Sequence, residues 1–266
     1  MTQNSPATEI IHDVLDPARA EALHVTLGLS RPVSPLLPFA HQVYFWTPAP
    51  AEALGTDGHP RVGGAGVIPD MGLPRRMWAG GRLEFHAPLL PGQPAEKHSQ
   101  LVAAREKTGR SGRLGLVTLR HEIRQAGTLC VTEEQDLVYR EPAHPDAPAP
   151  VPPKAPENAE ETREVAFTST MLFRYSALTF NGHRIHYDAD YARKAEGYAG
   201  LVVHGPLLAQ LLILMAEEAL GGLRRFSFRA TAPLFDFEAA TLCRAGNRLW
   251  VRGPDGRQCM EAEAEA

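Results

Sequence analysis

Two histidines and an amide form the clearest group of side chains able to do chemistry. His183 and His186 stand three residues apart, and Asn181 precedes them in the string FNGHRIHYD. An imidazole with an ordinary pKa is mostly neutral at pH 7 and can take a proton from water. An amide can hold that water, or fix the imidazole, without titrating. Either histidine could therefore be a general base.

A second candidate element follows within about twenty residues, at His204-Gly205-Pro206. Proline suits the first position of a helix, and the first N–H groups of a helix have no partner inside it. Gly205 has no side chain to obstruct a ligand. A carbonyl oxygen at this helix start would be polarised as in an oxyanion hole. The tripeptide could also simply begin a buried helix, but proton transfer and carbonyl polarisation are complementary needs of one reaction.

Metal and cofactor chemistry find little support in the sequence. A metal site could use His183, His186, Asp188 and Asp190, but no further ligand is evident, so we predict no metal and no cofactor. The three cysteines are far apart and lack CxxC spacing. We expect them to be buried thiols, with neither a disulfide framework nor a zinc site.

Composition indicates an ordinary soluble globular protein. The 266 residues are 44% hydrophobic and 22% charged, with a net charge of -4 and a pI near 6.3. The net charge predicts no overall positive electrostatic potential that would attract nucleic acid, and an anionic ligand would need a local basic patch. The N-terminus lacks the pattern of a signal peptide, and the longest apolar run, near residues 207–216, is about half of what crosses a bilayer. We predict a cytoplasmic protein that binds neither nucleic acid nor membrane.

The chain divides at a proline-rich segment, residues 141–158, which carries seven prolines and predicts a stiff, extended linker. In the first half, 1–140, residues 8–29 predict one or two short helices, and residues 30–80, rich in Pro and Gly, predict long loops that could pack over a site. From Arg82 onward, four stretches separated by turn residues predict an antiparallel meander. The second half, 159–266, ends in a similar meander.

The helix beginning at Pro206 decides the architecture. Its first half is apolar on every face, which predicts burial on all sides within a curved sheet. The strand at Leu83–Leu89 and the strand at Phe226–Leu234 share an aromatic start and an Ala, Pro, Leu ending, which indicates an internal repeat. No comparable apolar helix stands in the first half, so its helix should be reduced and not catalytic.

The second-half motif resembles a known family. FNGHRIHYDADYA followed by GLVVHGPLLAQLL resembles the hydratase motif of MaoC-like enoyl-CoA hydratases and acyl dehydratases. That motif carries a catalytic Asp, a spacer, Asn-Pro, an apolar residue and the catalytic His. In this register His186 matches the catalytic His and Gly205 the oxyanion-hole glycine. Asn181 replaces the Asp, and His183 and Arg184 replace Asn-Pro. The resemblance implies His186 as the main base, Asn181 orienting water and His183 in second place.

The family has the hot-dog fold, so the resemblance implies an α+β double hot-dog: two antiparallel sheets, each wrapped on a helix, with a degenerate N-terminal half. It covers residues 20–264. TFNGHRIHYD and the first-half string LPRRMWAGGRLEFHAPLLPGQPAEKHSQ are similar to mitochondrial-type 3-hydroxyacyl-thioester dehydratases and, more closely, to 3-methylfumaryl-CoA (mesaconyl-CoA) hydratases. The expected reaction is reversible hydration of 3-methylfumaryl-CoA to citramalyl-CoA.

Three alternatives stay open at this stage: a 3-hydroxyacyl-thioester dehydratase acting on CoA or acyl carrier protein, a hot-dog thioesterase, and a non-catalytic acyl-thioester binding subunit.

An acyl-CoA ligand is anionic, and arginine binds phosphate and carboxylate in fork geometry. The candidates for binding it are Arg75, Arg76, Arg174, Arg184, Tyr187 and His204, with Arg174 and Arg184 favoured because they flank the histidines. Hot-dog units usually pair, either within this chain or as a homodimer.

Overall fold

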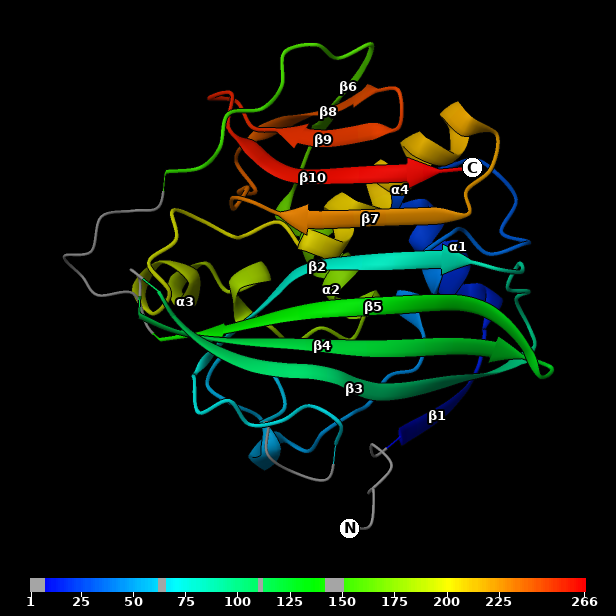
Figure 1. Cartoon of the computed structure of the whole chain (residues 1–266), viewed down its shortest axis with the longest axis horizontal. Coiled ribbons are helices and arrows are strands. Elements are labelled where there is room, and N and C mark those ends of the chain that lie inside the picture. Colours follow the sequence, from blue (N-terminus) through cyan, green and yellow to red (C-terminus); the bar gives the residue numbers. More distant parts are fainter. Residues whose placement is uncertain (1–7, 62–65, 110–111, 142–150) are drawn as a thin grey trace.

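Ten strands form one continuous antiparallel sheet in the order β1-β3-β4-β5-β2-β7-β10-β9-β8-β6 (Figure 1). The structure is a computed structural model that describes residues 8–61, 66–109, 112–141 and 151–266. The first half contributes β1 (Thr8–Val14), β2 (Arg75–Phe85), β3 (Pro94–Gly109), β4 (Gly112–Gln125) and β5 (Thr128–Arg140). The second half contributes β6 (Glu161–Ala166), β7 (Arg225–Ala230), β8 (Ala239–Ala245), β9 (Arg248–Arg252) and β10 (Gln258–Glu265).

The two halves repeat one plan and meet at β2 and β7, which pair antiparallel in the centre of the sheet. Leu83 lies opposite Phe226 in this pairing, so the two strands that carry the sequence repeat are direct neighbours. From this centre the order β2-β5-β4-β3-β1 is matched by β7-β10-β9-β8-β6. The two predicted sheets are therefore present, joined edge to edge, as expected of an α+β double hot-dog.

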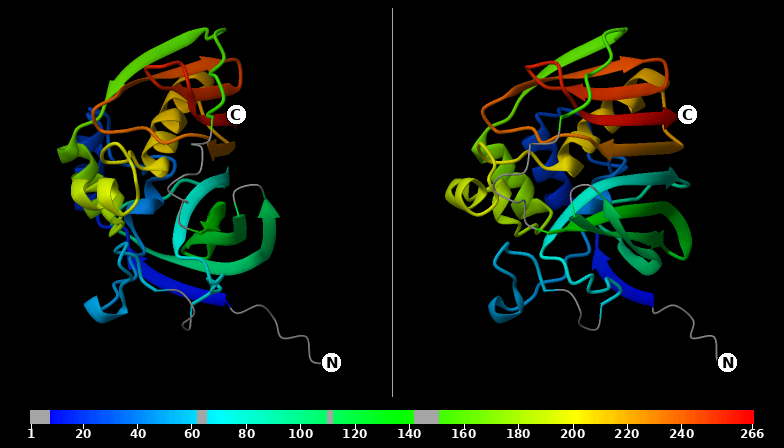
Figure 2. Two further views of the ribbon diagram at one scale, coloured as in Figure 1. Left: turned by 90° about the vertical axis from the view of Figure 1, so that its left-hand side faces the viewer. Right: turned by 60° about the vertical axis from the view of Figure 1, so that its left-hand side comes forward.

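The longer helices lie on one side of the sheet (Figure 2). They are α1 (Pro17–Leu27), α2 (Ser169–Leu178) and α4 (Gly205–Leu220), accompanied by the short α3 (Ala189–Lys194) and the 3₁₀ turns η1 (Ala40–Val43), η2 (Ala51–Ala53) and η3 (Arg184–His186). α4 is buried along most of its length and packs against β2, β7, β9 and β10. α1 is five residues shorter than the 16 residues of α4, which agrees with the reduced first-half helix that the sequence predicts.

Two local predictions were wrong. Residues 8–14 form strand β1 and not a helix, because TEIIHDV alternates in exposure and pairs with β3 along its whole length. The first-half strands also do not form a simple meander. β2 pairs with β5 and β7 and not with β3, since only an inner position lets it join the two halves.

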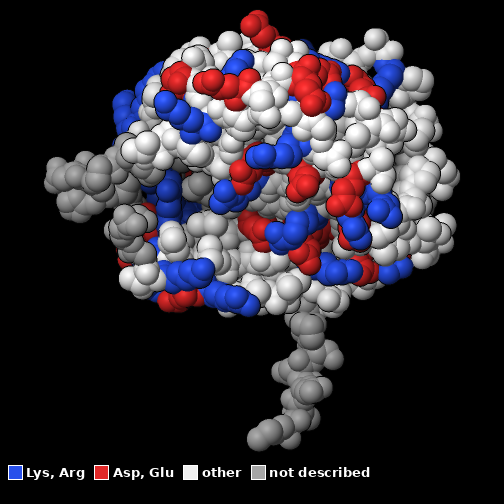
Figure 3. All heavy atoms as spheres, turned by 45° about the horizontal axis from the view of Figure 1, so that its top comes forward, with Lys and Arg blue, Asp and Glu red and all other residues white. Residues whose placement is uncertain are grey.

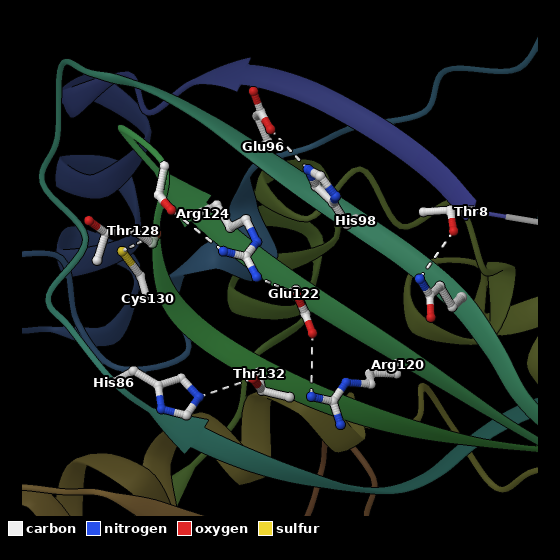
Figure 4. A network of polar contacts seen from close by, with 12 residues as sticks. Thr8, His86, Glu96, His98, Arg120, Glu122, Arg124, Thr128, Cys130 and Thr132 are labelled. Atoms are coloured by element: carbon white, nitrogen blue, oxygen red, sulfur yellow. Dashed lines mark hydrogen bonds and ion pairs between the residues drawn. The ribbon is translucent and has the colours of Figure 1, made fainter.

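The outer surface of the sheet is polar. Side-chain contacts on the first half join His98 to Glu96 within β3, Arg124 to Glu122 within β4, and His86 to Thr132 of β5, at 2.8–3.0 Å (Figure 4). Basic and acidic side chains lie interspersed on the face shown in Figure 3. The inner surface, by contrast, carries the apolar side chains that pack against the helices, as alternation along a strand requires.

The remaining predictions about the chain concern its linker, cysteines and membrane segments. Residues 142–150 of the predicted linker lie outside the described residues. Cys130, Cys243 and Cys259 are free and buried, as predicted. Within the described ranges, no helix is long and apolar enough to span a bilayer.

Candidate active site

His186 is held in one tautomer at the end of η3. Its Nδ1–H donates a hydrogen bond of 2.7 Å to the carbonyl oxygen of Val202. The Val202 N–H in turn donates to the carbonyl oxygen of Ile185 at 2.9 Å, so two backbone segments fix the ring. With the proton on Nδ1, the Nε2 atom carries the free lone pair, and it has no hydrogen-bond partner among the described residues. The ring is 7% exposed and can act as a proton acceptor in a nearly dry site.

The same ring lies against the start of α4. His186 stacks on His204 with ring centroids 3.7 Å apart and planes tilted by 19°. His204 is the N-cap residue of α4, is fully buried, and shares a hydrogen bond of 2.8 Å with the Ser176 hydroxyl. The structure therefore places His204 behind His186 as a packing partner. Its position does not favour the direct substrate contact that the sequence suggested.

Gly205 leaves room at this helix start. It is partly exposed, although His204 before it and Leu207 after it are fully buried. No acceptor for its N–H occurs within the described part of the chain, as the end of a helix predicts. A Cβ built on Gly205 would meet only the carbonyl oxygen of Trp78, at 3.8 Å. A small acceptor such as a thioester oxygen can approach this N–H.

Asn181 and His183 belong to a tight turn beside His186. The Asn181 Oδ1 atom accepts a hydrogen bond of 3.0 Å from the His183 N–H, so the amide oxygen stabilises the loop. The amide oxygen of Asn181 thus has a backbone partner, and its amide nitrogen has no partner among the described residues. The His183 ring is 9% exposed and meets the His186 ring edge to face at 5.4 Å. His183 is therefore the imidazole next to the predicted base.

Two residues that the sequence analysis did not identify complete the group, Asp57 and His59. They lie in the loop after η2, and the His59 ring approaches the His183 ring to 4.4 Å. The His59 Nδ1–H donates to Asp57 Oδ2 at 3.0 Å. The ligand-capable atoms of Asp57, His59 and His183 all lie within 4.8 Å of one another. One signal could have found the pair: Asp57-Gly58-His59 repeats the form of Asn181-Gly182-His183.

Burial keeps these imidazoles neutral. It lowers the pKa of His186 to about 4, and the hydrogen bond to Val202 only partly opposes this. Burial, with the like charges that His59 and His186 would carry, lowers the pKa of His183 to about 2. The pKa of His204 lies well below its ordinary value for the same reason. At neutral pH the site therefore offers free imidazole nitrogens and no imidazolium.

The predicted anion-binding side chains have different surroundings in the structure. Arg174 lies exposed on α2. Arg184 is bound to Asp188 at 2.7 Å and donates to the Thr56 carbonyl oxygen at 3.1 Å, so it holds loops together. Tyr187 is 45% exposed and donates to the Gly182 carbonyl oxygen.

Arg76 stands apart from this structural group. It lines a cavity of about 430 Å³ together with Asp57, His59 and Tyr139. No ion-pair partner occurs for Arg76 in the described ranges, whereas the neighbouring Arg75 is paired with Glu196. Among the predicted arginines, Arg76 thus combines a guanidinium that has no ion-pair partner in the described residues with a position in the cavity beside His59.

The structure thus places a helix-start N–H that has no acceptor among the described residues next to a neutral, oriented imidazole. The family model for hydroxyacyl-thioester dehydratase type 2 matches residues 39–236, and the chain belongs to this family. It is 46% identical over 268 residues to mesaconyl-C(4)-CoA hydratase of Chloroflexus aurantiacus, covering 97% of this chain and 95% of that protein.

More distant proteins align over most of the chain. A mitochondrial hydroxyacyl-thioester dehydratase type 2 of Schizosaccharomyces pombe is 29% identical, covering 92% of this chain and 93% of the relative. Among solved structures, HtdX of Mycobacterium tuberculosis aligns with a TM-score of 0.68 at 19% identity, covering 97% and 99% of the two chains. A second Mycobacterium tuberculosis protein, with a double hot-dog fold, aligns with a TM-score of 0.60 at 14% identity, covering 98% and 95%. The fold predicted from the sequence is thereby confirmed.

Proposed function

We propose that this protein adds water reversibly to the carbon–carbon double bond of an enoyl-CoA thioester. One observation carries the proposal: His186, whose Nε2 has no partner among the described residues, stacks on His204, the N-cap residue of α4. A proton acceptor and an unpaired helix-start N–H thus lie side by side. Family membership supports the same class of reaction, hydro-lyase chemistry on thioesters.

The geometry supports a simple sequence of steps. The thioester oxygen accepts a hydrogen bond from the Gly205 N–H, which polarises the conjugated double bond. His186 Nε2 takes a proton from water as the water oxygen bonds to the β-carbon. The π-electron pair moves toward the α-carbon and the carbonyl, forming an enolate at the helix start. The imidazolium then returns its proton to the α-carbon, so the enzyme ends as it began.

We further propose 3-methylfumaryl-CoA as the substrate, with citramalyl-CoA as the product. The 46% identical relative that acts on mesaconyl-C(4)-CoA supports this choice. Such a substrate carries a second carboxylate, and Arg76 offers a guanidinium beside the imidazoles without an ion-pair partner among the described residues. We expect that carboxylate to bind Arg76, which would place the β-carbon near His186.

The two halves of the repeat contribute different residues to the proposed site. Residues 159–266 contribute His186, His183 and Gly205, and residues 1–140 contribute Arg76 and the loop of Asp57 and His59. We propose that the second half is the catalytic half and that the first half closes the site over a small acyl group. The reaction is expected to take place in the cytoplasm without a cofactor.

A panel of thioesters tests the function. The purified protein is incubated with 3-methylfumaryl-CoA, crotonyl-CoA and crotonyl-acyl carrier protein, and the products are analysed by mass. A gain of one water on 3-methylfumaryl-CoA, faster than on the other two, is the expected result. Release of free CoA would indicate a thioesterase, tight binding without turnover a non-catalytic subunit, and preference for the carrier protein a dehydratase of fatty acid metabolism.

A further inference from the structure

The proposed mechanism lacks one group that the resembling hydratase motif provides. That motif carries a catalytic Asp where this chain has Asn181, whose amide oxygen is occupied by the His183 N–H. We propose that Asp57, acting through His59, supplies the missing carboxylate from the first half of the chain. The pair serves as a positioning element for the imidazoles of the second half. This inference rests on the proposed hydration reaction and assigns a role within it.

The backbone docks the Asp57 loop specifically onto the histidine loop. Gly58 and Gly182 are in direct contact, and the Arg184 N–H donates to the Asp57 carbonyl oxygen at 2.8 Å. The Arg184 side chain adds a hydrogen bond to the Thr56 carbonyl oxygen. Three contacts therefore hold the Asp57 loop against a segment more than 120 residues away in sequence. Such a long-range contact requires matched glycines, since a side chain on either one would separate the loops.

The docked side chains form one series of contacts. Asp57 accepts from His59 at 3.0 Å, His59 meets His183 at 4.4 Å between ring centroids, and His183 meets His186 at 5.4 Å. The charged or titratable groups that act on His183 are His59, His186, Asp57 and Arg76, so Asp57 is the carboxylate among them. Burial raises the pKa of Asp57, but the hydrogen bonds from His59, together with the positive charge that His59 and His183 would carry, lower it overall and favour the ionised carboxylate.

A carboxylate at this place would stabilise the positive charge that forms during the proposed reaction. When His186 takes the proton from water, a positive charge forms among buried, neutral imidazoles, where water cannot stabilise it. Asp57 lies within 4.8 Å of the ligand-capable atoms of His183, whose ring is 5.4 Å from that of His186, so its fixed negative charge opposes this penalty through the intervening rings in a medium of low dielectric constant. The Asp57 bond also fixes the His59 proton on Nδ1 and thus the orientation of the ring beside His183. Asp57 itself neither gains nor loses a proton.

The experiment uses the full-length protein with the substrate 3-methylfumaryl-CoA. Asp57→Asn keeps the shape and one acceptor oxygen but removes the charge, and His59→Asn keeps a donor toward Asp57 but removes the ring. We expect each variant to lower kcat about 10–100-fold with KM changed less than about threefold, because the pair acts on the charged state and not on substrate binding. The kcat of the double variant should be at most about threefold below that of the less active single variant, because both substitutions disrupt the same Asp57–His59 pair.

Three further measurements separate this role from a structural one. Asp190→Asn, at an exposed ion pair with Lys194, is the matched control and should retain kcat within about twofold. Thermal unfolding midpoints check that each variant folds. Asp57→Glu, which keeps the charge, should be clearly more active than Asp57→Asn.

Several results would overturn the inference. They are kcat of Asp57→Asn within about twofold of the wild type, independent losses that multiply in the double variant, and equal inactivity of the Glu and Asn variants. A kcat that falls after dialysis against EDTA and recovers with Zn²⁺ would also overturn it, because Asp57, His59 and His183 would then hold a cation. An active wild type with an unaffected Asp57→Asn variant defeats only this inference. A wild type inactive on every thioester defeats the proposed function as well.

Discussion

Gly58 and Gly182 touch through their backbones, with no room for a side chain on either. A Cβ on Gly58 would lie 2.0 Å from the Gly182 carbonyl oxygen, and a Cβ on Gly182 would lie 2.6 Å from the Gly58 carbonyl oxygen. Gly58 also has a φ of +89°, which L side chains rarely adopt. This contact joins a loop of the first half to the histidines of the second, so the geometry of the site depends on it.

Gly58→Ala should therefore separate the two loops. The clash and the backbone strain together should lower the free energy of unfolding by about 1–3 kcal/mol, and hydration should fall at least about tenfold. Urea unfolding and steady-state hydration measure the two effects. Gly246→Ala is the control, because Gly246 has a φ of +58° but open space around its Cβ position. Equal losses of activity in both variants would show that the contact has no bearing on the site.

His186→Asn tests the general base while keeping a donor for Val202. The Asn amide can occupy the place of Nδ1–H, which now donates to the Val202 carbonyl oxygen at 2.7 Å, but it cannot take a proton. We expect kcat to fall about 10²–10⁴-fold with the melting temperature nearly unchanged. His12→Asn, at a histidine side chain that is 72% exposed, should behave as the wild type. Retention of more than a tenth of the wild-type rate in His186→Asn would remove the assignment.

Gly205→Ala tests the carbonyl site. The nearest atom to a Cβ at this position is 3.8 Å away, so the protein should fold normally. The methyl group would stand beside the N–H where the thioester oxygen is proposed to bind, and kcat/KM should fall about tenfold or more. Gly222→Ala, beyond the other end of α4 and also in open space, should change neither quantity. Unchanged kcat/KM in Gly205→Ala would place the thioester elsewhere.

The sequence indicated which second-half residues lie together but not the first-half residues that lie beside them. His186 and Gly205 lie in one continuous stretch, and local rules for helix starts and loops were enough to bring them together. Asp57 and His59 were missed because their contact with His183 spans more than 120 residues, and loops rich in Pro and Gly carry no periodicity that predicts where they dock. The contacts of Arg184 could not be foreseen for a related reason: its partners, Asp188 and the Thr56 carbonyl oxygen, are brought to it only in the folded chain.

Stability should fall as the pH falls from about 6.5 to about 4. Burial lowers the pKa of both His186 and His121 from 6.5 to about 4, so the folded protein binds fewer protons than the unfolded chain in this window. The free energy of unfolding then decreases with decreasing pH, by about 1–3 kcal/mol for each such histidine. Urea unfolding at several pH values measures the slope. His186→Asn should make this slope shallower without abolishing it, because His121, His183 and His204 remain buried, and an identical slope in that variant would contradict the buried, neutral state of His186.

Arg76→Met should change the choice of substrate more than the chemistry. The guanidinium has no ion-pair partner in the described part of the chain and lines the cavity next to His59, so it is placed to bind the second carboxylate of 3-methylfumaryl-CoA. A charge-assisted hydrogen bond of this kind contributes about 1.5–3 kcal/mol, so kcat/KM for that substrate should fall about 10–100-fold. Crotonyl-CoA has no such carboxylate and serves as the internal control, with a change of less than about threefold. Equal losses on both substrates would instead indicate that Arg76 binds the CoA portion, because both thioesters share it.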